Sequence, residues 1–135
     1  MSFGYTTARF AIRFNKTKVY LSIFLTLISV LALTIYAYKT KQDFTLLGGL
    51  LCVLLVLLIV GIFLNIFLRI KILDLLFNIL GIILFSFYII YDTQLIIGKY
   101  SLKLSEDDYA LGVINLYLDI INLFVLILNL MGRNN

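Results

Sequence analysis

The chain has 135 residues, of which 63% are hydrophobic and 13% charged, and its mean hydropathy is +1.11. Soluble domains are usually about 45 to 50% apolar, so this composition excludes an ordinary soluble protein and indicates a membrane protein. The net charge of +4 lies almost wholly between the apolar runs, which favours contact with lipid headgroups and disfavours binding of nucleic acid.

Four apolar runs are long enough to cross a bilayer, whose hydrocarbon core of about 30 Å requires about 20 helical residues. They cover residues 19–38, 44–68, 72–97 or longer, and 106–131. Because the links between them are short, the sequence predicts an all-α membrane protein in which four transmembrane helices form an antiparallel bundle and consecutive helices are neighbours. We divide the chain into a basic N-terminal segment, 1–18, and a transmembrane helical domain, 19–135.

The N-terminal segment carries four basic residues, Arg9, Arg13, Lys16 and Lys18. A signal peptide is the alternative interpretation, but the apolar run that follows exceeds the usual length of about 7 to 15 residues and lacks a small-residue cleavage pattern. We therefore expect a retained span. The N-terminal segment, the second link and the C-terminus together hold seven Lys and Arg, against four in the other two links, so the positive-inside rule predicts both termini in the cytosol.

The start of the fourth run has a signal of its own. Ser105 followed by Asp108 fits a capping box, and the acids Glu106, Asp107 and Asp108 complement the positive end of a helix dipole. A calcium site formed by these three acids is the alternative. We favour the cap, because calcium takes six or more oxygen ligands and three adjacent acids do not supply a wrapped loop.

Polar residues recur at helical spacing in the last two runs. The third run carries Asp74, Asn78, Gly81, Phe85, Tyr88 and Asp92, and the fourth carries Asp108, Gly112, Asn115, Asp119, Asn122 and Asn129. Spacings of three, four and seven residues place each set on one helix face. An ionised aspartate in mid-membrane costs about 2.5 to 3.5 kcal/mol, so these faces should meet protein or water, not lipid.

Asp92 and Asp119 lie at matching depths in an antiparallel hairpin, roughly 16 and 20 Å from the shared end at about 1.5 Å per residue. We therefore predict that their carboxyl groups meet between the third and fourth helices. Two carboxyl groups at low dielectric constant cannot both ionise at little cost, so the pair should titrate as a unit. This indicates a proton-operated latch: a shared proton holds the helices together, whereas two ionised groups repel each other and attract a cation.

The other polar residues have simpler interpretations. Interhelical hydrogen bonding is the favoured role for the asparagines, Asn78, Asn115, Asn122 and Asn129. Asp74, close to Arg69 and Lys71 in sequence, is interpreted as part of an interfacial ion pair, with a place on an ion pathway as the alternative.

Three stretches resemble a known family. They are TKQDFTLLGG (Thr40 to Gly49), YIIYDTQLI (Tyr88 to Ile96) and LSEDDYALGVINLYLDIINLFVLIL (Leu104 to Leu128). These motifs closely resemble the Bax inhibitor family, and in particular its lifeguard branch. The resemblance implies a seven-helix fold of endoplasmic reticulum or Golgi membranes, of which this chain would supply the last four helices.

The resemblance further implies a protein that suppresses cell death and lets calcium leak down its gradient in a pH-sensitive way, without enzymatic activity or a cofactor. Asp92 and Asp119 would then be the counterparts of the family's paired aspartates, the proposed pH sensor and pore latch, where calcium would pass transiently. Asn78, Tyr88, Asn115 and Asn122 form the supporting polar stripe.

This chain departs from the family pattern in one respect. It has no counterpart of the first three helices, one of which supplies a basic partner for the aspartates. We therefore expect either a truncated product or several copies that assemble as a homo-oligomer in the lipid bilayer.

Two other functions are considered. One is a non-conducting interaction protein that modulates apoptosis or calcium through membrane partners, for which Gly48, Gly49 and Gly61 would offer a small-residue surface. The other is an intramembrane aspartyl protease, suggested by Tyr91-Asp92. It is disfavoured because the second aspartate lies in LYLD, residues 116–119, where that class has G-x-G-D.

Overall fold

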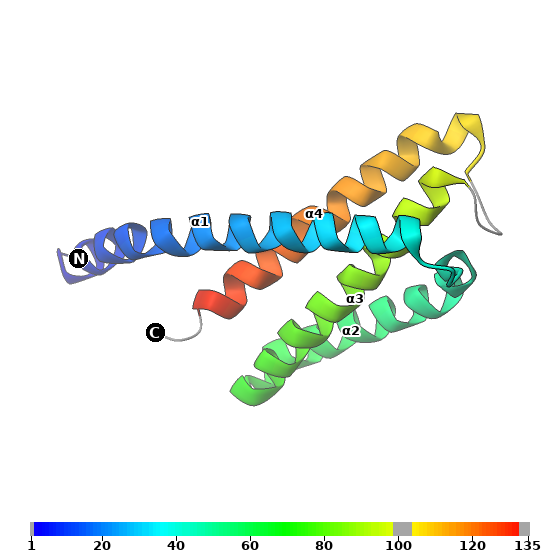
Figure 1. The fold of residues 1–135 in the computed structure, drawn as a ribbon. Coiled ribbons are helices and arrows are strands. Elements are labelled where there is room, and N and C mark those ends of the chain that lie inside the picture. The colour runs from blue at the N-terminus through cyan, green and yellow to red at the C-terminus, as the bar shows by residue number, and fades with distance from the viewer. Residues whose placement is uncertain (1, 99–103, 133–135) are drawn as a thin grey trace.

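The computed structural model describes residues 2–98 and 104–132, which form four α-helices and two short 3-10 helices. In chain order these are α1 (Ser2–Lys39), η1 (Phe44–Leu47), α2 (Gly48–Leu68), α3 (Lys71–Ile97), η2 (Glu106–Asp108) and α4 (Tyr109–Gly132) (Figure 1). Each α-helix contains or adjoins an apolar stretch long enough to span a membrane: Lys16–Lys39, Phe44–Leu68, Lys71–Ile97 and Glu106–Gly132. The predicted all-α membrane fold with four spans is therefore confirmed.

The helix ends differ from the expected spans in two ways. α1 continues without interruption from Ser2, so the basic segment and the first span form one helix; the chain contains no proline to stop it. The second and fourth spans each begin with a 3-10 turn. At the latter, Ser105 is the N-cap residue but makes no side-chain bond to the backbone, and its hydroxyl donates instead to Oδ2 of Asp108 at 2.9 Å. The predicted capping box is wrong in this detail.

α3 is the central helix of the fold. It packs against α1, α2, α4 and η1, and α1 also packs against α4. Figure 1 shows α2 and α3 as one hairpin and α1 crossing α3 and α4, with its N-terminal part extending beyond them. Within the described residues α1 and α2 do not pack on each other, so the prediction that consecutive helices are neighbours is wrong for this pair. The link between them passes to α3 instead.

Two small apolar clusters hold the helices together. Leu51 and Leu58 of α2 pack with Leu84 of α3, whereas Ile89 of α3 packs with Leu123 and Ile127 of α4. Most other large apolar side chains point outward along all four helices. An outward apolar surface of this extent suits helices surrounded by lipid, where side chains need not be buried in protein.

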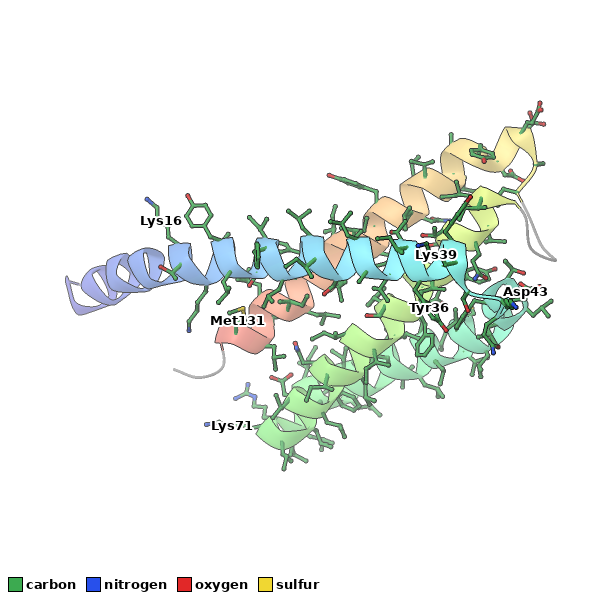
Figure 2. All side chains as sticks on the ribbon, viewed as in Figure 1. Lys16, Tyr36, Lys39, Asp43, Lys71 and Met131 are labelled. Atoms are coloured by element: carbon green, nitrogen blue, oxygen red, sulfur yellow. The ribbon has the colours of Figure 1, made fainter. Side chains whose placement is uncertain are left out.

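The contact between α1 and α4 includes a polar group. The Ser22 hydroxyl is fully buried and donates to the Met131 sulfur at 3.3 Å, and Figure 2 shows Met131 beside α1. Lys16 and Lys39 lie at the two ends of the apolar part of α1 (Figure 2). This spacing places both cations where lipid headgroups are expected.

Glycines of α2 serve contacts inside the chain. A Cβ atom at Gly48 would lie 2.5 Å from the Tyr91 hydroxyl oxygen, and one at Gly61 would lie 2.9 Å from Cζ of Phe77; both partners are on α3. A Cβ atom at Gly49 would meet nothing within 4 Å. Two of the three glycines expected to offer a surface to a partner protein therefore pack within the chain, which removes most of that argument for an interaction protein.

Gly48 and Gly49 provide a matched pair of substitutions. Gly49→Ala is expected to leave stability unchanged or raise it, since alanine favours helix, whereas Gly48→Ala must displace Tyr91. The two variants should differ by about 1 to 3 kcal/mol in free energy of unfolding, with Gly48→Ala the less stable. Thermal unfolding in detergent micelles, followed by circular dichroism, measures the difference. Equal stabilities would contradict the close approach of α2 and α3 at Gly48.

Candidate functional site

A groove runs between α2 and α4, with α3 as its floor. One part of it, which we call the carboxyl chamber, has a volume of about 610 Å³. It is lined by Tyr88, Tyr91 and Asp92 of α3, by residues of α2 such as Ile62, and by Asn115, Asp119 and Asn122 of α4. α2 and α4 do not pack on each other in the described part of the chain, so the groove is open between them. Both predicted site aspartates line the carboxyl chamber.

The two aspartates lie at the base of the carboxyl chamber. Asp92 is 7% exposed and Asp119 is 8% exposed, and their side chains lie within hydrogen-bonding reach of each other across the α3/α4 interface. Oδ2 of Asp119 is buried and has no hydrogen-bond partner among the described residues. An oxygen acceptor in this state attracts a proton or a cation, because leaving it unpaired costs about 1 to 3 kcal/mol.

The neighbours of the pair add no positive charge. Tyr88 and Tyr91, also on α3, line the chamber beside Asp92. Among the described residues, no lysine or arginine lines the carboxyl chamber. The chamber can therefore take up protons or cations, and nothing in its lining favours an anion.

The supporting polar residues divide into two groups. Asn78 is buried, and its Nδ2 donates to the Leu126 carbonyl oxygen of α4 at 2.9 Å, which is the interhelical role predicted for it. Asn115 and Asn122 are exposed on the wall of the carboxyl chamber, and Tyr88 is half-buried there. The asparagines of α4 therefore border the groove, whereas the asparagine of α3 fastens the two helices together.

A second cavity adjoins the first towards the start of α3. This Asp74 chamber also has a volume of about 610 Å³ and is lined by Lys18 of α1, Asp74 and Asn78 of α3, and Asn129 of α4. Asp74 borders in addition a smaller hollow with Arg69 and Lys71. The basic surroundings expected for Asp74 are thus present, and they include Lys18 from a helix that the sequence had not linked to it.

Gln94 is a structural residue that the sequence analysis missed. Its side chain is fully buried; Nε2 donates to the carbonyl oxygens of Ala37 at 3.2 Å and Gln42 at 3.0 Å, and Oε1 accepts from the Phe44 backbone amide at 2.7 Å. It therefore fastens the link between α1 and α2 to α3, at the end of the fold where Figure 2 places Tyr36 and Asp43. The available signal was a glutamine inside an apolar run, which needs polar partners there.

The acidic residues before α4 do not join the site. Glu106, Asp107 and Asp108 are all exposed. Over the described ranges, no group of three or more His, Cys, Asp or Glu side chains is arranged to hold a metal ion. These acids remain assigned to the start of the helix.

Comparison with known proteins places the chain in a family. The whole sequence, residues 1–135, matches the family described as inhibitor of apoptosis-promoting Bax1. The chain is 36% identical to protein lifeguard 3 of Homo sapiens and 33% identical to protein lifeguard 3 of Mus musculus, over 98% of this chain and 44% of each relative. It is also 40% identical, over 70% of its length and 39% of the relative, to an uncharacterized protein of Campylobacter jejuni.

The chain thus spans less than half the length of these curated relatives. The family match nevertheless covers every residue, and the lifeguard relatives exceed 30% identity along nearly the whole chain. With four helices able to span a membrane, the protein is an integral membrane protein that belongs to the Bax inhibitor family and is related to its lifeguard members.

Proposed function

We propose that this chain is the ion-handling part of a pH-sensitive calcium leak, in which the Asp92 and Asp119 carboxyl groups form the latch. Membership of the Bax inhibitor family supports a membrane protein that regulates cell death. The leak, its dependence on pH and its location in endoplasmic reticulum or Golgi membranes are the finer parts of the proposal.

The observation that carries the proposal is the pairing of two buried carboxyl groups at the base of an open groove with no basic lining residue among those described. With one proton shared, the pair joins α3 to α4. With both groups ionised, repulsion separates the helices and the two charges together attract a divalent cation. Calcium suits such a site as a transient occupant, because it prefers oxygen ligands and two carboxylates are too few to bind it tightly.

The pH dependence of calcium flux tests the proposal. The protein in liposomes loaded with a calcium-sensitive dye should pass calcium faster as pH rises, because loss of the shared proton opens the latch. Asp92→Asn and Asp119→Asn should each change this pH dependence, since neither variant can hold two negative charges at the pair. Identical flux in the original protein and both variants at every pH would rule out the latch.

A further inference from the structure

We infer that the groove contains a second barrier, an apolar constriction formed by Leu58 and Ile62 of α2 and Leu126 of α4 above Gly81 of α3. It lies between the carboxyl chamber and the Asp74 chamber and is separate from the carboxyl latch. The inference rests on the proposed function, because the barrier is argued to oppose passage of the cation that the carboxyl pair attracts.

The two chambers adjoin at this point. Ile62 and Leu126 line both of them, one from each wall of the groove. Beyond these residues the carboxyl chamber is polar through the aspartate pair, and the Asp74 chamber is polar through Lys18, Asp74 and its asparagines. The groove is therefore polar on both sides of an apolar step.

The floor of the constriction is a glycine. A Cβ atom at Gly81 would lie 2.9 Å from Cδ1 of Leu126 and 3.5 Å from Cδ2 of Leu58, so side chains from α4 and α2 converge directly over this residue. Gly81 lies on the same face of α3 as Asp74 and Asp92, between them in the sequence. The absence of a side chain there lets the Leu58 and Leu126 side chains approach the backbone of α3 from the two walls.

Leu126 is held in place by its own backbone. Its carbonyl oxygen accepts the hydrogen bond from Asn78 Nδ2 at 2.9 Å, which fixes α4 to α3 at the level of the constriction. The Leu126 side chain is half-buried, with Gly81 beneath it. The hydrogen bond fixes the position of the Leu126 backbone, and with it the place from which the leucine side chain reaches over Gly81.

An apolar constriction stops ions because water leaves it. A cation that enters must lose hydration without gaining ligands from leucine or isoleucine, and hydrophobic constrictions gate channels by this dewetting. Two barriers in series then control the path: the carboxyl pair responds to pH, whereas the constriction responds to the distance between α2 and α4. Substitutions at the two places should therefore have different signatures.

Water access to introduced cysteines tests the barrier without requiring calcium flux. Cys52 is the only cysteine, so Cys52→Ser gives a cysteine-free background. Asn129→Cys reports on the Asp74 chamber, Asn122→Cys on the carboxyl chamber, and Tyr117→Cys, on an outward surface of α4, reports on lipid exposure. A membrane-impermeant thiol reagent is applied to liposomes of fixed orientation, on the face that carries the α2–α3 turn.

From that face we expect Asn129→Cys to react readily and Asn122→Cys to react at the low rate of Tyr117→Cys. Adding Leu126→Ser should raise the rate at Asn122→Cys at least tenfold, because a hydroxyl admits water to the constriction. Leu118→Ser is the control, because Leu118 lines only the carboxyl chamber. This substitution should not raise the labelling rate at Asn122→Cys. If Leu126→Ser does not fold, Ile62→Ser on the opposite wall takes its place in the same measurement.

Two outcomes would overturn the barrier: Asn122→Cys reacting as fast as Asn129→Cys without Leu126→Ser, or remaining unreactive in both the Leu126→Ser and Ile62→Ser backgrounds. Calcium flux separates this failure from failure of the proposed function. If the protein passes calcium with a pH dependence lost in Asp92→Asn, the latch stands whatever the labelling shows. If labelling behaves as expected but no calcium passes, the constriction stands and the calcium leak does not.

Discussion

Replacing Gln94 by leucine is expected to lower the free energy of unfolding by about 3 kcal/mol, because three backbone groups lose the partner that the buried glutamine side chain provides. Leucine has a similar size but can neither donate to the carbonyl oxygens of Ala37 and Gln42 nor accept from the Phe44 amide. The effect should be large because the Gln94 side chain has no solvent exposure.

The adjacent residue provides the control. Thr93 is 6% exposed, and its Oγ1 is buried without a hydrogen-bond partner in the part of the chain that the structure describes. Thr93→Val keeps the shape and removes an unsatisfied hydroxyl, so it should leave stability unchanged or raise it by up to about 1 kcal/mol. Thermal unfolding in detergent micelles compares both variants. An equal loss in the two would show that burial at this level of α3, and not the Gln94 hydrogen bonds, determines stability.

The Gln94 contacts also position the site. α2 packs only on α3 and η1 in the described residues, and η1 follows directly from the link that Gln94 holds. Phe44 of η1 adds ring contacts to Tyr36 of α1 and Phe87 of α3, with centroids 6.0 and 6.1 Å apart. Loss of the glutamine should therefore loosen the α2 wall of the groove as well as the link itself.

Sequence periodicity leads to a prediction for the two aspartates but to none for the Gln94 contacts, and the reason is physical. The stripes of α3 and α4 follow from the helical repeat, which is local, so Asp92 and Asp119 could be assigned to facing surfaces from spacing and depth alone. The partners of Gln94 are backbone groups at the end of α1, in the following link and at the start of η1, 50 to 57 residues away. No repeat in the sequence encodes where such a link passes.

The local nature of sequence patterns also explains why the predicted contact between α1 and α2 is wrong. Short links restrict which helices can be adjacent but do not decide on which side of α3 a helix packs. Ser22 and Thr26 of α1 are buried, and Ser22 faces Met131 of α4, yet neither residue belongs to a stripe that the sequence made recognisable. Depth matching could be applied to the aspartates because an antiparallel hairpin leaves only one geometry to consider.

Asparagine and alanine at position 119 are expected to have opposite effects on calcium flux, and this contrast tests how the latch works. In Asp119→Asn, the amide can donate a hydrogen bond to the Asp92 carboxyl group whether or not that group carries a proton. α3 and α4 should then stay joined at every pH, with flux at least tenfold below the maximum of the original protein and independent of pH.

In Asp119→Ala, no group remains to bind Asp92, and α3 and α4 lose their polar contact in the carboxyl chamber. Flux should be independent of pH here too, but higher than in Asp119→Asn by about tenfold, because the helices are no longer held together. Calcium flux into dye-loaded liposomes, measured between pH 5 and 8, compares the two variants. Equal unfolding temperatures of the two confirm that neither result reflects loss of the fold.

If both substitutions abolish flux alike, the second charge is needed to attract the cation, and the pair acts as a binding site in place of a latch. If asparagine alone closes the path, the helices are controlled by a hydrogen bond across the α3/α4 interface, which two ionised carboxylates cannot make.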